Sequence, residues 1–515
     1  MLLDTAWFYH SLHAAQAPYI ITACVLIVLS CFLGKTSVDG IPVINPRQKW
    51  ELTESAARGR FLVNAREMLR RAISDFPGRP FKVLCGFGDV IVLPAEKINE
   101  IRNDRRLKFT LGPIFYYPGF EGLNKCIDDE SLFDVIKLDL TRHLDKMTDT
   151  ISEETSAALG KVFSRNTEWH DIMLKQDVLQ LIARVASRQF AGEELCRNED
   201  WLRVSVDYTR DIFIASVVLR MMPPLLRPAL HWILPPCRAI RREMLQARKI
   251  IKAVLERRRA EQTALAGSGE KKVYDDVLEW SEQRSRGGEH DPAATLIALS
   301  ILALHTTTDL ICRVLLDLSE RPGLVDELRR EMVRCLSENG WSKKALHDMK
   351  LLDSVIKESL RMDPGDLTSL SRSVLEDVTL SDGTVLTKGS QTVVPSYRLW
   401  DSSLYENPDT YDPYRFVNMR KTKGKEATSL LVTTTENFMA FGHGRLACPG
   451  RFFAANQIKT SLVHLLLKYD WRPAEGYVRE PLKFDFVEQF DPMSKVAMRR
   501  RREEVDLDLF YRGST

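Results

Sequence analysis

The stretch FGHGRLACPGRFFA (441–454) is the part of the sequence that decides the fold. Cys448 lies in a glycine-containing loop between Gly444 and Gly450, and a run that reads as a helix follows. Glycines let a backbone approach a bulky flat ligand closely. A helix that begins just after the cysteine points its free N–H groups and positive dipole end at the sulfur, which favours thiolate. Cys448 is therefore a candidate metal ligand or a candidate nucleophile with His443 as its base, and a buried structural cysteine is the alternative.

Two further patterns lie upstream of this loop. Glu358 and Arg361 in DSVIKESLRMDP (353–364) are three residues apart, so they share one face of a predicted helix. An exposed pair of this kind contributes little to stability, but the helix is largely apolar, and a buried pair would need further partners. The second pattern is PDTYDPYRF (408–416), which places Arg415 in a loop and by itself reads as an ordinary turn.

A long apolar segment follows Pro292 and ends before Arg321-Pro322, which predicts one helix. Its apolar run is interrupted by HTTTD (305–309) and by Arg313, so we do not expect it to span a membrane. A helix that is apolar on most sides runs through the middle of a protein. The sequence therefore predicts a central helix in this part of the chain.

Helical patterns predominate in the rest of the chain, notably over 50–76 and from about 130 to 260. Short β-rich runs over 81–94 and 374–396 predict two hairpins. No linker and no repeat divides the chain after residue 50. Although 515 residues favour several domains on length alone, we expect one large, mainly α domain with small β-sheets.

The charge balance and the cysteines exclude several classes of protein. Lys plus Arg number 73 and Asp plus Glu number 70, and this even balance argues against a nucleic-acid-coating protein. The nine cysteines form no CxxC motif and no close-spaced framework, which excludes a disulfide scaffold and a zinc ribbon. The pattern suits a reducing compartment.

The N-terminal region predicts a membrane anchor. The segment from Ala17 to Gly34 carries no charge and, at about 1.5 Å per residue, nearly crosses a ~30 Å hydrocarbon layer. Residues 1–16 contain no Lys or Arg, whereas Lys35, Arg47 and Lys49 follow the segment. The positive-inside rule then places the long C-terminal part in the cytosol. A buried core helix is the alternative.

Together and in this order, the patterns resemble the cytochrome P-450 superfamily of haem-thiolate monooxygenases. Its cysteine motif is matched by Phe441, Gly444, Cys448 and Gly450. Its Glu-x-x-Arg motif is matched by Glu358 and Arg361, and its Pro-x-Arg-Phe loop ends at Arg415-Phe416. The resemblance covers essentially the whole chain after the anchor and implies the P-450 fold. It implies that Cys448 is the proximal ligand of the iron of haem b, and that Glu358, Arg361 and Arg415 form a buried triad behind the cysteine loop.

The same resemblance assigns roles on the central helix. Thr306 matches the threonine that helps to deliver protons in the family, and His305 stands where the family usually has an acid. A histidine titrates near neutrality, so His305 is a candidate proton relay, with a plain core histidine as the alternative. This His-Thr-Thr variant is similar to a group of fungal enzymes of secondary metabolism, many of which act on terpenoid or meroterpenoid skeletons.

The sequence departs from the family where a haem propionate is usually held. Two residues before the cysteine the family carries a base, and Leu446 stands there in this chain. The resemblance then leaves Arg372 as the best propionate partner and Arg445 as a weaker one. Arg142 or His143, in the predicted helix over 140–154, is a further candidate partner of a propionate.

The implied function is a single-pass monooxygenase of the endoplasmic reticulum that inserts one oxygen atom from O2 into an apolar small molecule, a terpenoid or a related secondary metabolite. The thiolate ligand favours O–O cleavage. Electrons come from NADPH through a separate cytochrome P-450 reductase, since the sequence shows no flavin-type domain. The alternatives are a haem-thiolate isomerase or peroxygenase, which needs no reductase, and a non-catalytic haem-binding protein. The expected organisation is a lumenal N-terminus (1–16), a transmembrane anchor (17–34), a proline-containing linker (35–49) and a cytosolic catalytic domain (50–515).

Overall fold

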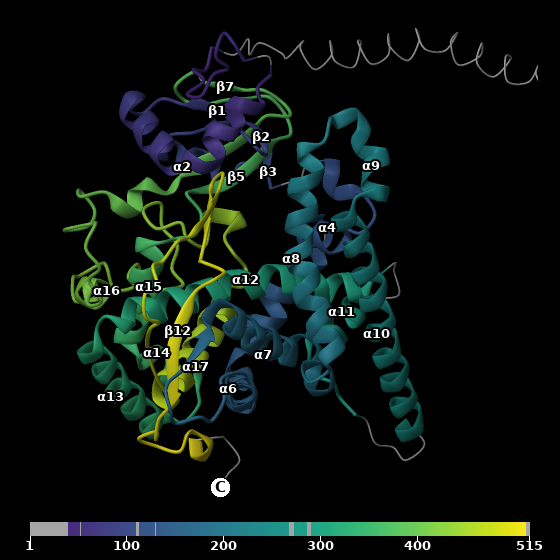
Figure 1. The fold of residues 1–515 in the computed structure, drawn as a ribbon, viewed down its shortest axis with the longest axis vertical. Helices are drawn as coiled ribbons and strands as arrows, with labels where there is room; N and C mark the ends of the chain where they lie inside the picture. The colour runs from purple at the N-terminus through teal and green to yellow at the C-terminus, as the bar shows by residue number, and fades with distance from the viewer. Residues whose placement is uncertain are drawn as a thin grey trace, which may run out of the picture.

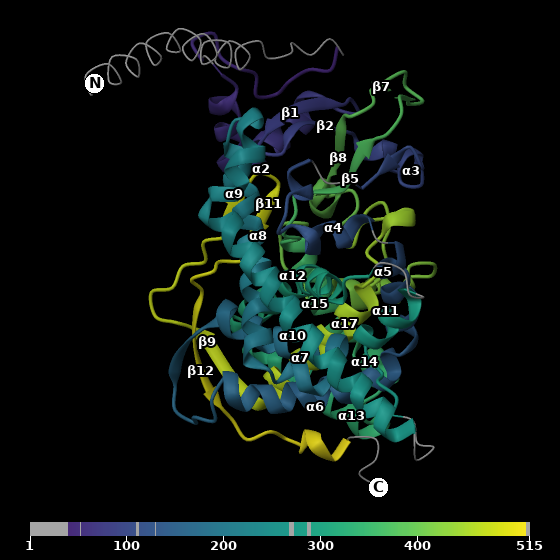
Figure 2. The same ribbon diagram turned by 90° about the vertical axis from the view of Figure 1, so that its right-hand side faces the viewer.

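The computed structural model describes residues 40–51, 53–109, 113–128, 130–266, 272–285 and 290–510. The predicted lumenal N-terminus and transmembrane anchor lie outside these ranges. Helices make up the larger part of the described chain (Figure 1). Figure 2 shows a small sheet at one end of the molecule and a stack of helices at the other. The fold is thus mainly α with small β-sheets, as predicted.

Sixteen α-helices are described. They are α2 (Ser55–Asp75), α3 (Ile98–Ile101), α4 (Glu121–Asp128), α5 (Glu130–Asp134), α6 (Leu144–Val162), α7 (Leu174–Cys196), α8 (Glu199–Met221), α9 (Arg227–Ile233), α10 (Pro235–Ala266), α11 (Val277–Ser285), α12 (Pro292–Ser319), α13 (Pro322–Asn339), α14 (Lys343–Asp348), α15 (Lys350–Met362), α16 (Arg415–Arg420) and α17 (Arg451–Lys468). Short 3-10 helices are η1 (Ala95–Lys97), η2 (Pro113–Tyr116), η4 (Pro224–Leu226), η5 (Ser396–Trp400), η6 (Gly444–Leu446) and η7 (Leu507–Phe510), and η3 (Val135–Leu140) is a π-helix.

The described strands form four small sheets. They are β1 (Phe81–Cys85), β2 (Gly88–Val92), β3 (Leu107–Lys108), β4 (His170–Met173), β5 (Thr368–Val374), β6 (Val378–Thr379), β7 (Val385–Leu386), β8 (Gln391–Pro395), β9 (Tyr469–Pro473), β10 (Leu482–Phe484), β11 (Val487–Gln489) and β12 (Lys495–Arg500). The largest sheet has the order β1-β2-β8-β5-β3, with only β2 and β8 parallel. The others are β4-β12-β9, β10-β11 and β6-β7. The antiparallel pairs β1-β2 and β6-β7 confirm the two predicted hairpins.

Helix α12 is the predicted central helix. The Asp291 side chain accepts a hydrogen bond from the Ala294 N–H, and Pro292 occupies the first turn, so both usual start signals are present. The helix packs against α4, α7, α8, α10, α15 and α17 and therefore runs through the middle of the molecule (Figures 1 and 2). Within the described ranges it is the one helix long and apolar enough to cross a membrane. Most of its side chains are buried inside the protein, so it is a core helix.

The described part of the predicted linker lies against the sheet. Ile44 donates its N–H to the Lys82 carbonyl at 3.0 Å, and Lys82 donates its N–H to Pro42 at 2.7 Å. The buried Asn45 amide donates to the Leu84 carbonyl at 2.7 Å. Residues 42–45 thus belong to the folded body, while the predicted domain boundaries themselves stay a prediction.

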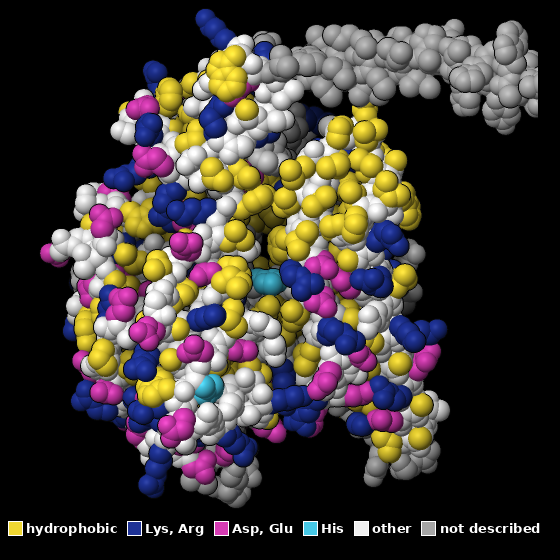
Figure 3. All heavy atoms as spheres, in the orientation of Figure 1, with side chains coloured by type: hydrophobic (Ala, Val, Ile, Leu, Met, Phe, Trp, Pro, Cys, Tyr) yellow, Lys and Arg dark blue, Asp and Glu magenta, His cyan; other side chains and the backbone are white. Residues whose placement is uncertain are grey.

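Large apolar side chains are exposed where α8 ends and over the following segment. We call Met221, Leu225, Leu226, Trp232 and Ile233 the α8–α9 apolar surface. Figure 3 shows apolar side chains gathered over this part of the molecule. Figure 1 places α9 at the same end as α2 and β1, where the described chain begins.

Candidate functional site

The cysteine loop is fixed through its main chain. Cys448 lies between η6 and α17, and its N–H donates to the Phe441 carbonyl at 2.7 Å. The Arg451 guanidinium donates to the Cys448 carbonyl at 2.7 Å and to the Val432 carbonyl at 3.1 Å. These bonds hold the backbone on both sides of the sulfur. The position of the sulfur is therefore set by the loop and does not depend on its own contacts.

Gly444 of this loop lies close to the backbone of Arg102. Gly444 has a φ of +79°, and a Cβ there would lie 2.9 Å from both the Cβ and the carbonyl oxygen of Arg102. The Arg445 N–H donates to the Asn103 side chain at 2.8 Å, so the loop docks on the residues that follow α3. A Cβ on Gly450 would meet only Ile136, at an ordinary 3.7 Å. The expected approach of Gly444 and Gly450 to a flat ligand stays a prediction.

Burial, and not the helix dipole, decides the state of the thiol. Desolvation raises the pKa of Cys448, although the N–H of Gly450 and the charge of Arg451 act in the opposite direction. The expectation that the helix start favours thiolate is thus outweighed here. A metal ion that coordinates a thiol deprotonates it. Both ring nitrogens of His443 are engaged elsewhere, because Nε2 lies 2.6 Å from Arg102 and Nδ1 lies 3.3 Å from Thr434, which weakens the nucleophile alternative.

The structure brings Glu358, Arg361 and Arg415 together. The Arg361 guanidinium donates to both Glu358 oxygens, at 2.8 and 2.9 Å. Arg415 Nε lies 3.1 and 3.2 Å from the same two oxygens. All three side chains are buried. Glu358 is thus the single carboxylate between two guanidinium groups, which is the further partnership that a buried pair requires.

The triad organises the chain that leads to the cysteine loop. Arg361 donates to the Leu399 carbonyl at 2.6 Å, and Arg415 donates to the Thr410 carbonyl at 3.0 Å. The Asp412 N–H donates to Glu358 at 3.0 Å. Three side chains on α15 and α16 therefore satisfy the backbone of an irregular segment, which would otherwise carry unpaired polar groups inside the protein.

A second buried network on α15 is missed by sequence reasoning. Asp353 pairs with Lys459 of α17 at 2.6 Å and with Arg420, and it accepts the Leu431 N–H at 3.0 Å. Lys357 donates to the Leu430 carbonyl at 2.7 Å. In the sequence these residues read as ordinary helix charges. The available signal is the apolar composition of α15, because a mostly apolar helix is buried and its charged side chains are then buried with it.

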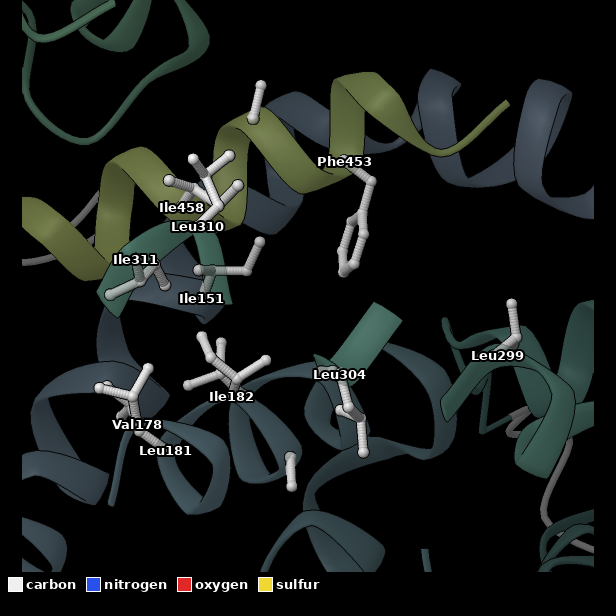
Figure 4. Close-up of a cluster of buried hydrophobic side chains, with 14 of the residues drawn as sticks. Ile151, Val178, Leu181, Ile182, Leu299, Leu304, Leu310, Ile311, Phe453 and Ile458 are labelled. Atoms are coloured by element: carbon white, nitrogen blue, oxygen red, sulfur yellow. The ribbon is translucent and has the colours of Figure 1, made fainter. Parts of the chain in front are cut away.

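The middle of α12 borders an internal space. Leu302 is 45% exposed and Thr306 is also exposed, whereas Leu299, Leu304 and Leu310 around them are buried. Two exposed side chains one turn apart on an otherwise buried helix show that solvent enters an opening along this face of α12. Helix α17 packs against the same helix, and Figure 4 shows its side chains entering the core shared with α6, α7 and α12. The helix that follows Cys448 therefore rests on the helix that carries Thr306.

His305 is turned towards α8. Its Nε2 lies 2.9 Å from the Thr209 hydroxyl, and its ring meets Phe213 edge to face at 6.3 Å. Burial lowers the pKa of His305 to about 4, so the imidazole is neutral at pH 7. Contrary to expectation, this histidine does not titrate near neutrality, because desolvation disfavours its charged form. Its place in a proton relay stays a prediction.

Arg372 is a buried cation without an anion among the described residues. Its Nη1 donates to the Ser371 carbonyl at 2.7 Å, and its Nη2 has no hydrogen-bond partner within the described ranges. Burial, and to a smaller extent the charge of Arg445, lower the pKa of Arg372 to about 10. A buried guanidinium in this state is unfavourable unless an anionic group pairs with it. Arg372 therefore fits the carboxylate of a ligand.

The other candidates for an anionic group are placed less favourably. Arg445 and Arg142 are exposed. The His143 ring stacks on Trp280 at 4.8 Å, and its Nδ1 lies 2.8 Å from the Asp139 carbonyl. Arg102, which sequence reasoning did not select, has a buried Nε without a partner in the described chain. The fixed cysteine, the opening along α12 and the unpaired Arg372 together fit a haem group.

The comparisons with known proteins all point to one family. The family model for cytochrome P-450 matches residues 136–490. Cytochrome P-450 monooxygenase hepE of Aspergillus oryzae is 42% identical over 470 residues, which cover 90% of this chain and 86% of hepE. Cytochrome P-450 monooxygenase 1 of Gibberella fujikuroi is 40% identical over 83% of this chain and 99% of its own. Among solved structures, retinoic acid-bound cyanobacterial CYP120A1 shares the fold, with a TM-score of 0.64 at 17% identity over 86% of this chain and 96% of that chain.

Proposed function

Because this chain belongs to the cytochrome P-450 family and is a haem-thiolate monooxygenase, we propose that it acts as a membrane-anchored enzyme of fungal secondary metabolism. Its proposed reaction inserts one oxygen atom from O2 into an apolar small molecule, a terpenoid or a related intermediate. The observation that carries the proposal is the solvent-exposed face of α12, formed by Leu302 and Thr306 on the helix that packs against α17.

The haem supplies the activation of O2, and the chain supplies its surroundings. Cys448 would bind the haem iron through its sulfur and Arg372 would pair with a propionate, with Phe441, Gly444, Gly450 and Arg445 around the cysteine loop. Leu302 gives the opening an apolar wall that suits a hydrocarbon skeleton.

Thr306 is assigned to proton delivery. Its hydroxyl donates to the Leu302 carbonyl at 3.3 Å, which is longer than the usual 2.7–2.8 Å for an O–H···O bond. The hydroxyl can therefore turn and donate into the opening at small cost. His305 is assigned a supporting place in the same relay as a neutral imidazole, with Thr209 as its partner.

Two surfaces support the proposed membrane location and the proposed redox partner. The α8–α9 apolar surface lies at the end of the molecule where the described chain begins, so both can meet one lipid surface on the cytosolic face of the endoplasmic reticulum. Lys421, Lys423 and Lys425 are exposed in the segment after α16, and Arg445 is exposed on the cysteine loop. A basic surface of this kind suits the acidic face of an NADPH–cytochrome P-450 reductase.

We expect Thr306→Ala to uncouple oxygen consumption from substrate oxidation. The holoenzyme is assayed with NADPH and reductase on a panel of terpenoids, and product is scored by incorporation of oxygen-18 from O2. Loss of a positioned proton donor should lower product formation by about 100-fold. NADPH oxidation should continue, with its two electrons appearing in hydrogen peroxide.

Thr307→Val is the matched control, since Thr307 is buried and does not face the opening. Product formation without reductase and NADPH would contradict the proposed reaction. Unchanged coupling in Thr306→Ala would contradict the role assigned to Thr306.

We expect Arg372→Leu to weaken the hold on haem and to stabilise the haem-free protein. Loss of a charge-assisted hydrogen bond to a propionate should speed haem transfer to apomyoglobin by about tenfold. The same change removes a buried cation without an anion, so the haem-free protein should unfold at a higher urea concentration. Arg79→Leu, at an exposed position between α2 and β1, is the control. Equal transfer rates in the two variants would refute the assignment.

A further inference from the structure

A surface cavity lies between α8 and α10, apart from the residues assigned to the haem. Its volume is about 440 Å³, which is within the range of small-ligand sites. The described residues that line it come from α8 and from the first turns of α10, and they are Asp211, Ile214, Pro235, Pro236, Arg238, Ala239 and Arg242. None of these side chains has a part in the proposed reaction.

Two arginines on the α10 wall of this cavity have no anionic partner in the described chain. Arg238 and Arg242 are four residues apart, so they lie on one face of the helix. Both side chains are exposed, and neither guanidinium forms an ion pair or a hydrogen bond with another described residue. Their spacing lets both guanidinium groups contact one ligand.

The nearby acidic groups do not cancel these two charges. Asp211 is the one acid among the described lining residues, and Arg210 already pairs with it at 2.7 Å. Glu243 follows Arg242 in the chain but is buried. Burial, together with the charge of Asp211, raises the pKa of Glu243 to about 7, so its carboxyl group is not fully ionised at neutral pH. The cavity therefore offers net positive charge to a ligand.

The other walls of the cavity are apolar and adjoin the α8–α9 apolar surface. Ile214 is 44% exposed, and Pro235 follows Ile233 of that surface by two residues. Arg241 fixes the junction, because it donates to the Trp232 carbonyl at 2.8 Å and lies over the Trp232 ring at 5.0 Å. Figure 1 shows α10 running from α9 away from the end of the molecule where the described chain begins. Only the first turns of α10 thus lie beside the surface that is proposed to meet lipid.

We propose that this cavity binds the head group of an anionic phospholipid from the membrane that anchors the protein. The phosphate pairs with Arg238 and Arg242, since guanidinium groups match phosphate oxygens in geometry as well as in charge. The acyl chains lie along Ile214 and the α8–α9 apolar surface. This inference rests on the proposed function, because it takes that surface to meet lipid, and it names the class of lipid bound there. Apolar contact alone is non-directional, so a held head group would fix how the catalytic domain is turned on the membrane.

The test uses the full-chain holoenzyme in phosphatidylcholine nanodiscs that contain a small fraction of phosphatidylglycerol with a diazirine in one acyl chain. Labelled peptides are identified by mass spectrometry after irradiation, and unlabelled phosphatidylglycerol is the competitor. In the wild type, labelling should concentrate on the segments around Ile214 and Pro235. Phosphatidylcholine with the same diazirine should label these segments much less.

The variant Arg238→Gln/Arg242→Gln measures the contribution of the two guanidinium groups. One arginine near an anionic membrane surface contributes a factor of about five in affinity. Loss of both should therefore raise the fraction of competitor needed for half-maximal displacement by about 25-fold. Displacement of the lipid by inorganic phosphate would contradict the proposal, because the acyl chains would then be unnecessary.

Lys249→Gln/Lys252→Gln is the matched control, because it removes two exposed positive charges from α10 outside the cavity. The competitor fraction for half-maximal displacement should stay unchanged in this variant. Equal effects of the two double variants would show a general attraction of α10 to anionic lipid and would overturn the head-group site. The red-shifted Soret band of reduced protein with carbon monoxide should be present in both variants, since these side chains lie outside the haem site.

The labelling pattern separates failure of this inference from failure of the proposed function. Equal labelling of the cavity by the phosphatidylglycerol and phosphatidylcholine probes would refute the head-group site and leave the membrane contact of the α8–α9 apolar surface in place. Absence of label from α8, α9 and α10 with both probes would refute that membrane contact, and the head-group site with it.

Discussion

Cys448→Ala should abolish the thiolate signature of the holoenzyme. Reduced wild-type protein with bound carbon monoxide should show the red-shifted Soret band of thiolate ligation, and the variant should show none. The loop itself should persist, because it is held by the main-chain bond from Cys448 to Phe441 and by the bonds of Arg451. A thiolate ligand would donate the electron density that favours O–O cleavage, and the variant has no thiolate at this position. Mutation of a group that only supports a metal ligand typically lowers activity by up to about 100-fold. Loss of the ligand itself should lower turnover by more than that.

Cys335→Ala is the matched control, since Cys335 is another free cysteine but is buried on α13. Its red-shifted band should remain intact. A band of unchanged position and intensity in Cys448→Ala would overturn the assignment of the axial ligand. A histidine-type band in the wild type would do the same.

Glu358→Ala should largely prevent the chain from folding around haem. The change leaves Arg361 and Arg415 buried without their shared carboxylate. Breaking a buried ion pair in this way costs about 3–5 kcal/mol, against a typical total stability of about 5–15 kcal/mol. The segment from Leu399 to Asp412 also loses its organising contacts. We expect a low yield of soluble holoprotein and a much lower urea midpoint, whereas Glu358→Gln, which keeps acceptors, should be less severe.

Glu67→Ala provides a control of similar chemistry. Glu67 pairs with Arg71 on α2 at 3.1 Å, but both side chains are exposed. Such a helix pair contributes about 0.2–0.5 kcal/mol, so its loss should barely move the urea midpoint. The comparison isolates burial as the cause. Equal destabilisation in Glu358→Ala and Glu67→Ala would show that the triad does not hold the fold together.

Local sequence signals anticipated many of the elements around the site. Asp291 and Pro292 mark the start of α12, and the apolar run behind them gives its central course. Glycine and proline bracket the cysteine loop, and two β-rich runs around Gly86 and Gly88 mark the β1-β2 hairpin. These signals are readable because capping, turn geometry and periodicity act between residues that are close in the chain.

Other features depend on packing between distant segments. The sequence left His305 as either a proton relay or a plain core histidine, and contact with α8 buries the ring and keeps it neutral. Asp353 and Lys357 read as ordinary helix charges, although the segments packed against α15 bury both.

The sequence by itself determined the family of chemistry: a cysteine in a glycine-bracketed loop, a Glu-x-x-Arg helix and a threonine on a long apolar helix. Only the tertiary structure decided which charged groups are desolvated, which of them find partners and which face the internal space. The physical reason is that desolvation is the sum of contacts from every neighbouring element, and no single segment of the chain carries that sum.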